Sequence, residues 1–187
     1  MGYRFPGLLF LILLSLGGTA EANTDSVTFS GLLLSHERVL GVESKVRRAG
    51  VLRHARFGSH TFALEATPLF WHLKGQRLPG EMRGEKLPGL QAVALYGPGA
   101  RIGNVELALQ AGIGLGGLLF ITHMGPGINP YIDIPVRVAA YWNPLSRLAI
   151  GGSLTAGYAH DHALTSWRWV RRPRLGGQFV LAFGGTN

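Results

Sequence analysis

The residues with the most obvious chemical potential are His160, Asp161 and His162, which follow one another late in the chain. Two imidazoles and a carboxylate could bind a metal ion, or one imidazole oriented by the acid could act as a base. A confident zinc site needs a further ligand, and adjacent residues of a strand point to opposite faces. We therefore predict solvent-exposed loop histidines and no resident metal. A metal-binding or pH-sensitive site and a catalytic site are the alternatives.

A catalytic role for His160 would also need a hydroxyl nucleophile and an acid that orients the ring. Thr165 and Ser166 supply the nearest hydroxyl groups, and no Asp or Glu follows Asp161. The three residues therefore do not complete a hydrolase site of the usual kind, and a catalytic role would require an unusual path of the loop.

Arginine dominates the basic residues, with 15 Arg against three Lys and a formal net charge of +8. Four arginines lie in one short stretch together with two tryptophans: Trp167, Arg168, Trp169, Arg171, Arg172 and Arg174. Guanidinium groups bind phosphate in bidentate fashion, and Trp favours the lipid–water interface. In an exported protein this stretch predicts binding to lipid headgroups and to the phosphates of lipopolysaccharide, and no binding to nucleic acid.

Four further ionisable residues fall on the small-residue face of alternating segments: Glu65, Glu106, Asp133 and Arg137. Charged groups in a narrow interior must be paired, because their desolvation costs several kcal/mol. We predict a structural charge network there, with an ion or proton path as the alternative. Nothing in the sequence places a substrate between Glu65 and Glu106.

Strict alternation of side chains indicates the elements that position these residues. In residues 131–142 one face is bulky and apolar while the other holds Asp133, Pro135 and Arg137. Such a run exceeds the usual soluble strand and fits the roughly 9–11 residues that a tilted strand needs to cross a bilayer. Pro135 disfavours an interior strand, so we expect a local bulge there.

The same pattern recurs along the chain. Clear strands are expected at 104–115, 148–158 and 175–183, and less regular ones at 27–35, 61–72 and 89–96. Residues 46–57 give the weakest signal, equally compatible with a helix or a loop. The apolar faces are uniformly bulky and the polar faces small, which favours a membrane barrel with its bulky face on lipid over a soluble, lipocalin-type barrel.

The connections are expected to alternate between short and long. Short turns are expected at Gly58 and Ser59, at 97–99 and at 143–146, and long loops at 74–88, 120–130 and 160–173. This alternation is typical of outer-membrane barrels, whose periplasmic turns are short. Aromatic residues beside the connections predict two interfacial girdles: Tyr96, Tyr141 and Trp142 beside the turns, and Phe70, Trp71, Phe120, Tyr131 and Tyr158 beside the loops.

The first residues predict export. Arg4 precedes the apolar run 8–16, and Ala20 and Ala22 form a small-x-small cleavage signal, so residues 1–22 are expected to be a signal peptide and 23–187 one barrel domain. The chain contains 28 Gly, no Cys and only 15% charged residues. Low charge and abundant glycine suit a membrane barrel, and the lack of Cys excludes a disulfide scaffold and thiolate chemistry.

This layout resembles the small eight-stranded outer-membrane barrels such as the OmpA transmembrane domain, over residues 26–184. The resemblance is architectural and implies an all-β, antiparallel eight-stranded transmembrane barrel that is assembled by the barrel assembly machinery. A fainter similarity links His160 to the catalytic His of the lipid A 3-O-deacylase barrels. In that motif, His162 and Ala163 replace the serine and asparagine that follow the family's histidine.

We therefore expect a bacterial outer-membrane barrel of structural or lipopolysaccharide-binding type, without a cofactor and too narrow for a general pore. Its expected partners are outer-membrane lipid, lipopolysaccharide and the assembly machinery. A lipid A-modifying enzyme of deacylase type with a degenerate site, and a soluble periplasmic lipid-binding barrel, are the alternatives.

Overall fold

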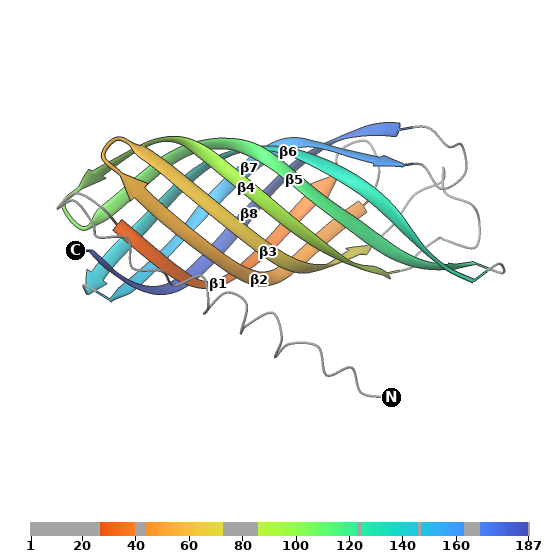
Figure 1. The fold of residues 1–187 in the computed structure, drawn as a ribbon, viewed down its shortest axis with the longest axis horizontal. Helices are drawn as coiled ribbons and strands as arrows, with labels where there is room; N and C mark the ends of the chain where they lie inside the picture. The colour runs from red at the N-terminus through yellow and green to blue at the C-terminus, as the bar shows by residue number, and fades with distance from the viewer. Residues whose placement is uncertain are drawn as a thin grey trace, which may run out of the picture.

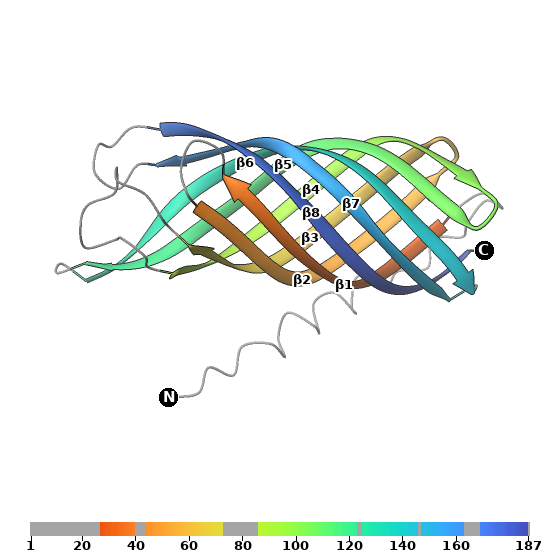
Figure 2. The same cartoon turned by 180° about the vertical axis from the view of Figure 1, so that it is seen from behind.

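A computed structural model describes residues 27–39, 44–72, 86–122, 125–145, 147–162 and 169–186. The predicted signal peptide lies outside these residues. The described part of the chain forms eight antiparallel strands, and Figures 1 and 2 show them inclined to the long axis of one barrel. Their bounds are β1 Val27–Val39, β2 Ser44–Phe57, β3 His60–His72, β4 Lys86–Ile102, β5 Val105–Thr122, β6 Gly125–Leu145, β7 Leu148–His162 and β8 Trp169–Thr186.

The strands pair in chain order, and β8 closes onto β1. One circuit of paired residues leads from Thr28 through Ala55, Phe62, Tyr96, Ala111, Val136, Ala156 and Leu175 back to β1 at Arg38. The register thus advances by ten residues around the barrel, from 28 to 38. A stagger of this kind tilts the strands, typically by roughly 35–45°, and sets the width of the barrel. With eight strands, the interior has room for side chains only.

Pro135 of β6 is accommodated without a bulge. At Pro135, the pairing between β5 and β6 stops after Ala111 with Val136 and resumes at Gly114 with Asp133 in the same register. Pro135 has no N–H to donate, so the ladder skips this position while its other edge still pairs with Gly157 of β7. The bulge expected at Pro135 is therefore wrong.

Three tight turns connect β2 to β3, β4 to β5 and β6 to β7 at one end of the barrel, which we call the turn end. The first two place Gly58 and Gly103 at φ = 59°, a left-handed conformation that glycine adopts without steric cost. The turn expected at 97–99 is wrong, because β4 continues to Ile102. Gly97 instead lies where an added Cβ would overlap the backbone of Leu109 on β5.

The opposite end, where β1 meets β2, β3 meets β4, β5 meets β6 and β7 meets β8, is called the loop end. The long loop expected at 120–130 is wrong, since β5 and β6 form a hairpin in which β5 runs to Thr122 and β6 begins at Gly125. This hairpin projects beyond the other strands in both views (Figures 1 and 2). Residues 46–57 are a regular strand, β2, despite their weak pattern.

The interior is layered along the barrel axis. An apolar cluster that includes Phe29, Leu52 and Tyr141 fills the turn end, and a second cluster with Trp71 and Tyr131 fills the loop end. Polar and charged side chains lie between and beside these clusters, and Arg56 and Glu106 lie within two residues of the turns at the turn end. Trp71, Tyr131 and Tyr141 thus point into the lumen and not into the girdles predicted for them, whereas Tyr96, Trp142, Phe70 and Tyr158 are on the outer face.

Candidate functional site

The charged residues of the lumen are balanced. Among the described residues, four carboxylates and four guanidinium groups are buried: Glu37, Glu65, Glu106, Asp133, Arg48, Arg56, Arg137 and Arg174. The alternation of the strands turns each of these side chains inward, since the barrel interior takes every second residue. Equal numbers of the two signs allow all eight groups to remain ionised without net charge in the lumen.

Glu37 is the centre of the largest group of contacts. Arg48 from β2 lies 2.7 Å and Arg174 from β8 lies 2.9 Å from the same carboxylate oxygen, Oε2. Arg174 also forms an ion pair with Asp133 of β6, and Gln91 of β4 donates to Asp133 Oδ2 over 2.8 Å. This group of five side chains therefore ties five strands together across the lumen.

A second group connects β6, β3, β8 and β7. Arg137 forms an ion pair with Glu65, and the amide of Gln178 donates to Glu65 Oε2 over 3.4 Å. Ser153 in turn donates to Gln178 Oε1 over 2.9 Å. Arg137 and Glu65 are almost fully buried, so each depends on the other for neutralisation.

A third group lies toward the turn end. Arg56 Nε donates to Glu106 Oε2 over 2.9 Å, and His54 Nε2 is 3.8 Å from Glu106 Oε1. The His54 ring stacks on Phe29 with ring centres 4.7 Å apart, and its centre is 5.0 Å from that of Tyr141. Glu106 is thus held at the turn end, beside the aromatic rings of the apolar cluster.

These contacts can neutralise charge and hold the register of the strands. Ion pairs between strands that are distant in sequence resist sliding of one strand past another. The predicted residues Glu65, Glu106, Asp133 and Arg137 all face the lumen, and of the three acids it is Glu65 that forms an ion pair with Arg137. Within the described residues, no group of three or more His, Cys, Asp or Glu side chains could hold a metal ion.

The outer face is apolar over a broad band. Exposed large apolar side chains come from all eight strands and include Leu34, Phe57, Leu64, Leu90, Leu109, Val138, Leu154 and Phe179. Leu109 pairs with Val138, and Val138 pairs with Leu154, so these three form a continuous row in the middle of the wall. Water-soluble monomers rarely expose connected apolar patches above a few hundred Å². In β5, β6, β7 and β8, the side chains predicted to face outward are those that the structure places on the outer face.

A basic group is exposed on the outer face near the loop end. It consists of His36 and Arg38 on β1 and Lys45 and Arg47 on β2, and we call it the basic rim. His36 pairs with Arg47, and Arg38 pairs with Lys45, so the four side chains occupy two neighbouring rungs. Every carboxylate side chain whose burial the structure describes is in the lumen. The rim cations are therefore not matched by described acids on the same face.

The structure describes the side chain of one of the four arginines predicted to bind anions. Arg174 was expected in the last loop, but β8 already pairs with β7 from Trp169, and Arg174 is buried on Glu37 and Asp133. Its assignment as a surface anion-binding residue is therefore wrong. Arg168 and the side chains of Arg171 and Arg172 lie outside the described part of the structure.

His160 ends up on the strand and not in a loop. It lies in β7, pairs with Ile132 of β6 and Arg171 of β8, and is half-buried on the outward face. Asp161 and His162 complete β7, but their side chains lie outside the description, as do Thr165 and Ser166. Among the described residues, none forms a hydrogen bond or ion pair with His160, and the described residues do not test the alternative of a catalytic role for it.

Sequence reasoning missed Glu37, Arg48, Arg56 and His54. The signal that could have found them is the parity of each strand: Ser35 and Glu37 alternate with the exposed His36 and Arg38, and Arg48, His54 and Arg56 share one parity in β2. This alternation can be recognised only when each strand is followed beyond its apolar part into the stretch where charged residues begin.

None of the described residues forms a helix that combines the length and the apolar character needed to cross a membrane.

No protein-family model matches the sequence, and no curated protein matches it. Among solved structures, the chain is similar to Neisserial surface protein A, with 14% identity, a TM-score of 0.50 and coverage of 90% of this chain and 100% of that one. Two structures with lower TM-scores, 0.48 and 0.39, are Yersinia pestis Ail with the heparin analogue sucrose octasulfate and the N-terminal β-barrel domain of Pseudomonas aeruginosa OprF. Their identities are 16% and 13%, over 86% and 82% of this chain and 96% of each of theirs.

Eight antiparallel strands closed in chain order, an apolar outer face and the likeness to the neisserial protein lead to one conclusion. The chain has the all-β fold of the small eight-stranded outer-membrane barrels.

Proposed function

We propose that the chain is exported, loses residues 1–22 and spans the outer membrane as a closed barrel that binds lipopolysaccharide and performs no catalysis. The exposed apolar band on all eight strands supports the membrane location, because its burial in hydrocarbon removes it from water. The short turns would then face the periplasm, and the loop end with the basic rim would face outward.

The lumen supports a non-conducting barrel. A pore needs a continuous column of water, whereas this interior holds paired charges and two apolar clusters that include Leu33, Leu52, Trp71 and Tyr131. A soluble lipid-binding barrel would need an apolar interior and a charged exterior, which is the reverse of the observed arrangement.

The observation that carries the binding proposal is the basic rim. Arg38, Lys45 and Arg47 project outward at the loop end of β1 and β2, beyond the exposed apolar residues of β1, where lipid headgroups would meet water. Lipopolysaccharide carries phosphate at that level, and basic residues near an anionic membrane surface contribute about 1 kcal/mol each. Arg168, Arg171 and Arg172 remain part of this proposal as further candidates for phosphate binding.

Equilibrium binding of purified lipopolysaccharide to the refolded barrel tests the proposal. The Arg38→Gln/Arg47→Gln variant should bind about 10- to 30-fold more weakly than wild type, because two phosphate contacts are lost. The matched control is Arg101→Gln/Arg147→Gln, which removes two exposed cations near the turn end and should bind like wild type. Equal affinity in all three proteins, or no salt dependence, would overturn the binding function.

Mass spectrometry of lipid A after incubation tests the absence of catalysis. We expect every acyl chain to remain attached. Loss of a fatty acid with wild type, and its retention with His160→Ala, would replace the binding function with the deacylase.

A further inference from the structure

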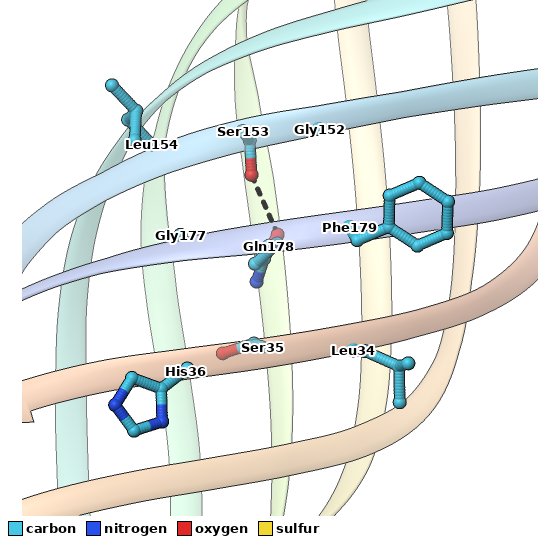
Figure 3. A pocket seen from close by; sticks show the side chains of 9 residues that line it. All are labelled: Leu34, Ser35, His36, Gly152, Ser153, Leu154, Gly177, Gln178 and Phe179. Carbon is cyan, nitrogen blue, oxygen red and sulfur yellow. Dashed lines mark hydrogen bonds between the residues drawn. The ribbon is translucent and has the colours of Figure 1, made fainter.

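The outer wall has a groove across β1, β8 and β7. Its volume is about 650 Å³, within the range of ligand pockets. Gly177 of β8 pairs with His36 of β1 and with Leu154 of β7, while Gly152 of β7 pairs with Phe179 of β8. Figure 3 shows the Leu34, Leu154, Phe179 and His36 side chains around these two glycines. The floor of the groove is thus glycine backbone, and its walls are mostly hydrocarbon.

The groove exists because Gly177 has no side chain and nothing else fills its place. A Cβ added at Gly177 would meet its nearest neighbouring atom at 3.8 Å, an ordinary contact distance. At Gly176, the next residue, an added Cβ would overlap Glu37 in the lumen. Behind the groove, Ser153 donates to Gln178 over 2.9 Å on the lumen side (Figure 3). The groove is therefore a feature of the outer face and is backed by the polar lumen.

Charge is distributed unevenly along the groove. Going from Leu34 through His36 to Arg38, β1 runs from the apolar band toward the loop end. His36 lines the groove and also belongs to the basic rim, whose Arg47 is its partner on β2. An apolar groove that ends at the basic rim matches a molecule with a hydrocarbon chain attached to an anionic head. In a wall that faces the outer leaflet, phosphorylated lipid A has this chemistry.

We propose that one acyl chain of lipopolysaccharide lies in the groove over Gly177 and Gly152 while a phosphate of the same molecule contacts the basic rim. This assignment rests on the proposed lipopolysaccharide-binding function and adds the site at which the lipid portion is held. Apolar contact with Leu34, Leu154 and Phe179 orients the chain along the wall, and the rim selects the charged head. Phospholipids lack this arrangement of phosphates and therefore compete only weakly for the groove.

The test fills the groove without touching the rim. In Gly177→Leu the added side chain occupies the floor, and in Gly177→Ala it does so partly. The control Ala92→Leu adds bulk to an exposed position on the outward face of β4, outside the groove lining and away from β1, β8 and β7. Each variant is refolded, its folding is checked by the gel shift on boiling, and its affinity for purified lipopolysaccharide is measured beside that of Arg38→Gln/Arg47→Gln.

Gly177→Leu should weaken binding at least tenfold, the equivalent of about two methylene groups withdrawn from apolar contact, with a smaller loss for Gly177→Ala and none for Ala92→Leu. If the rim variant binds weakly but both Gly177 variants bind like wild type, the groove is not the acyl site and the proposed function stands. If wild-type protein does not bind lipopolysaccharide, both proposals fail.

Discussion

Arg47 and Arg48 are neighbours in β2, yet they belong to different environments. Arg48 turns into the lumen, is nearly fully buried and contacts Glu37 at 2.7 Å. Arg47 turns outward, is exposed and belongs to the basic rim beside His36. The lumen tolerates an arginine only where a carboxylate neutralises it, whereas the outer face leaves its cations available for an external anion. Under the proposed function, the two faces of one strand thus separate stability from binding.

The largest effect is expected where a lumen pair is broken from one side. Arg137→Met removes the ion-pair partner of Glu65 and leaves a buried carboxylate with only the long contact from Gln178. Breaking a buried pair in this way typically costs about 3–5 kcal/mol. The urea midpoint of unfolding in lipid vesicles should therefore fall clearly.

The double variant Arg137→Met/Glu65→Gln is the matched control for this prediction. Because it removes both charges, it should recover much of the lost stability. An unchanged midpoint in the single variant, or no recovery in the double variant, would mean that the pair is not the source of the stability.

A smaller effect should separate Arg48 from Arg47. Arg48→Met removes one of two cations on Glu37, because Arg174 remains, so the loss of stability should be about 1.5–3 kcal/mol. Arg47→Met should change stability by less than about 0.5 kcal/mol, as exposed substitutions usually do, while it weakens lipopolysaccharide binding. Parallel urea titrations and binding curves measure both effects. Equal losses of stability in the two variants would erase the distinction between the faces.

The sequence predicted the fold best where one face is uniformly bulky. In β5 through β8 the outward residues are nearly all apolar, so alternation identified both the strands and their orientation. In β2 the pattern fails, because Arg47 and Arg53 face outward while Arg48 and Arg56 face inward. Hydropathy alone cannot distinguish a cation paired across a lumen from a cation exposed at a rim.

Turn-forming residues misled the prediction at two places. Gly97 and Pro98 have the composition of a turn, but β4 runs on through them, since Gly97 permits close approach to β5 and Pro98 only interrupts the ladder. Pro173 suggested that a loop extended to the neighbouring Arg174, but it pairs with Tyr158 inside β8. Partners in neighbouring strands decide these positions, and a single sequence does not contain that register.

The candidate site was predicted in part for the same reason. Glu65, Glu106, Asp133 and Arg137 lie on segments whose alternation was readable, and they were assigned to the lumen on that basis. The sequence does not predict Glu37 as a lumen residue, because the strand expected there ends at Ser35, two residues earlier, whereas β1 continues to Val39. The groove at Gly177 depends on three strands that meet only after the barrel closes, so no local pattern indicates it.

The central claim is that the outward face contacts hydrocarbon, and the absence of cysteine makes a direct measurement possible. Leu154 is 70% exposed at one end of the apolar row in the middle of the wall, and Arg147 is exposed beside a turn. Leu154→Cys and Arg147→Cys, each labelled with a polarity-sensitive fluorophore, are refolded into vesicles that carry quenchers at defined acyl-chain depths. We predict blue-shifted emission at position 154 with the strongest quenching by the deepest quencher, and quenching only by shallow groups at 147. Water-like emission at 154, with no dependence on quencher depth, would contradict a membrane-spanning barrel.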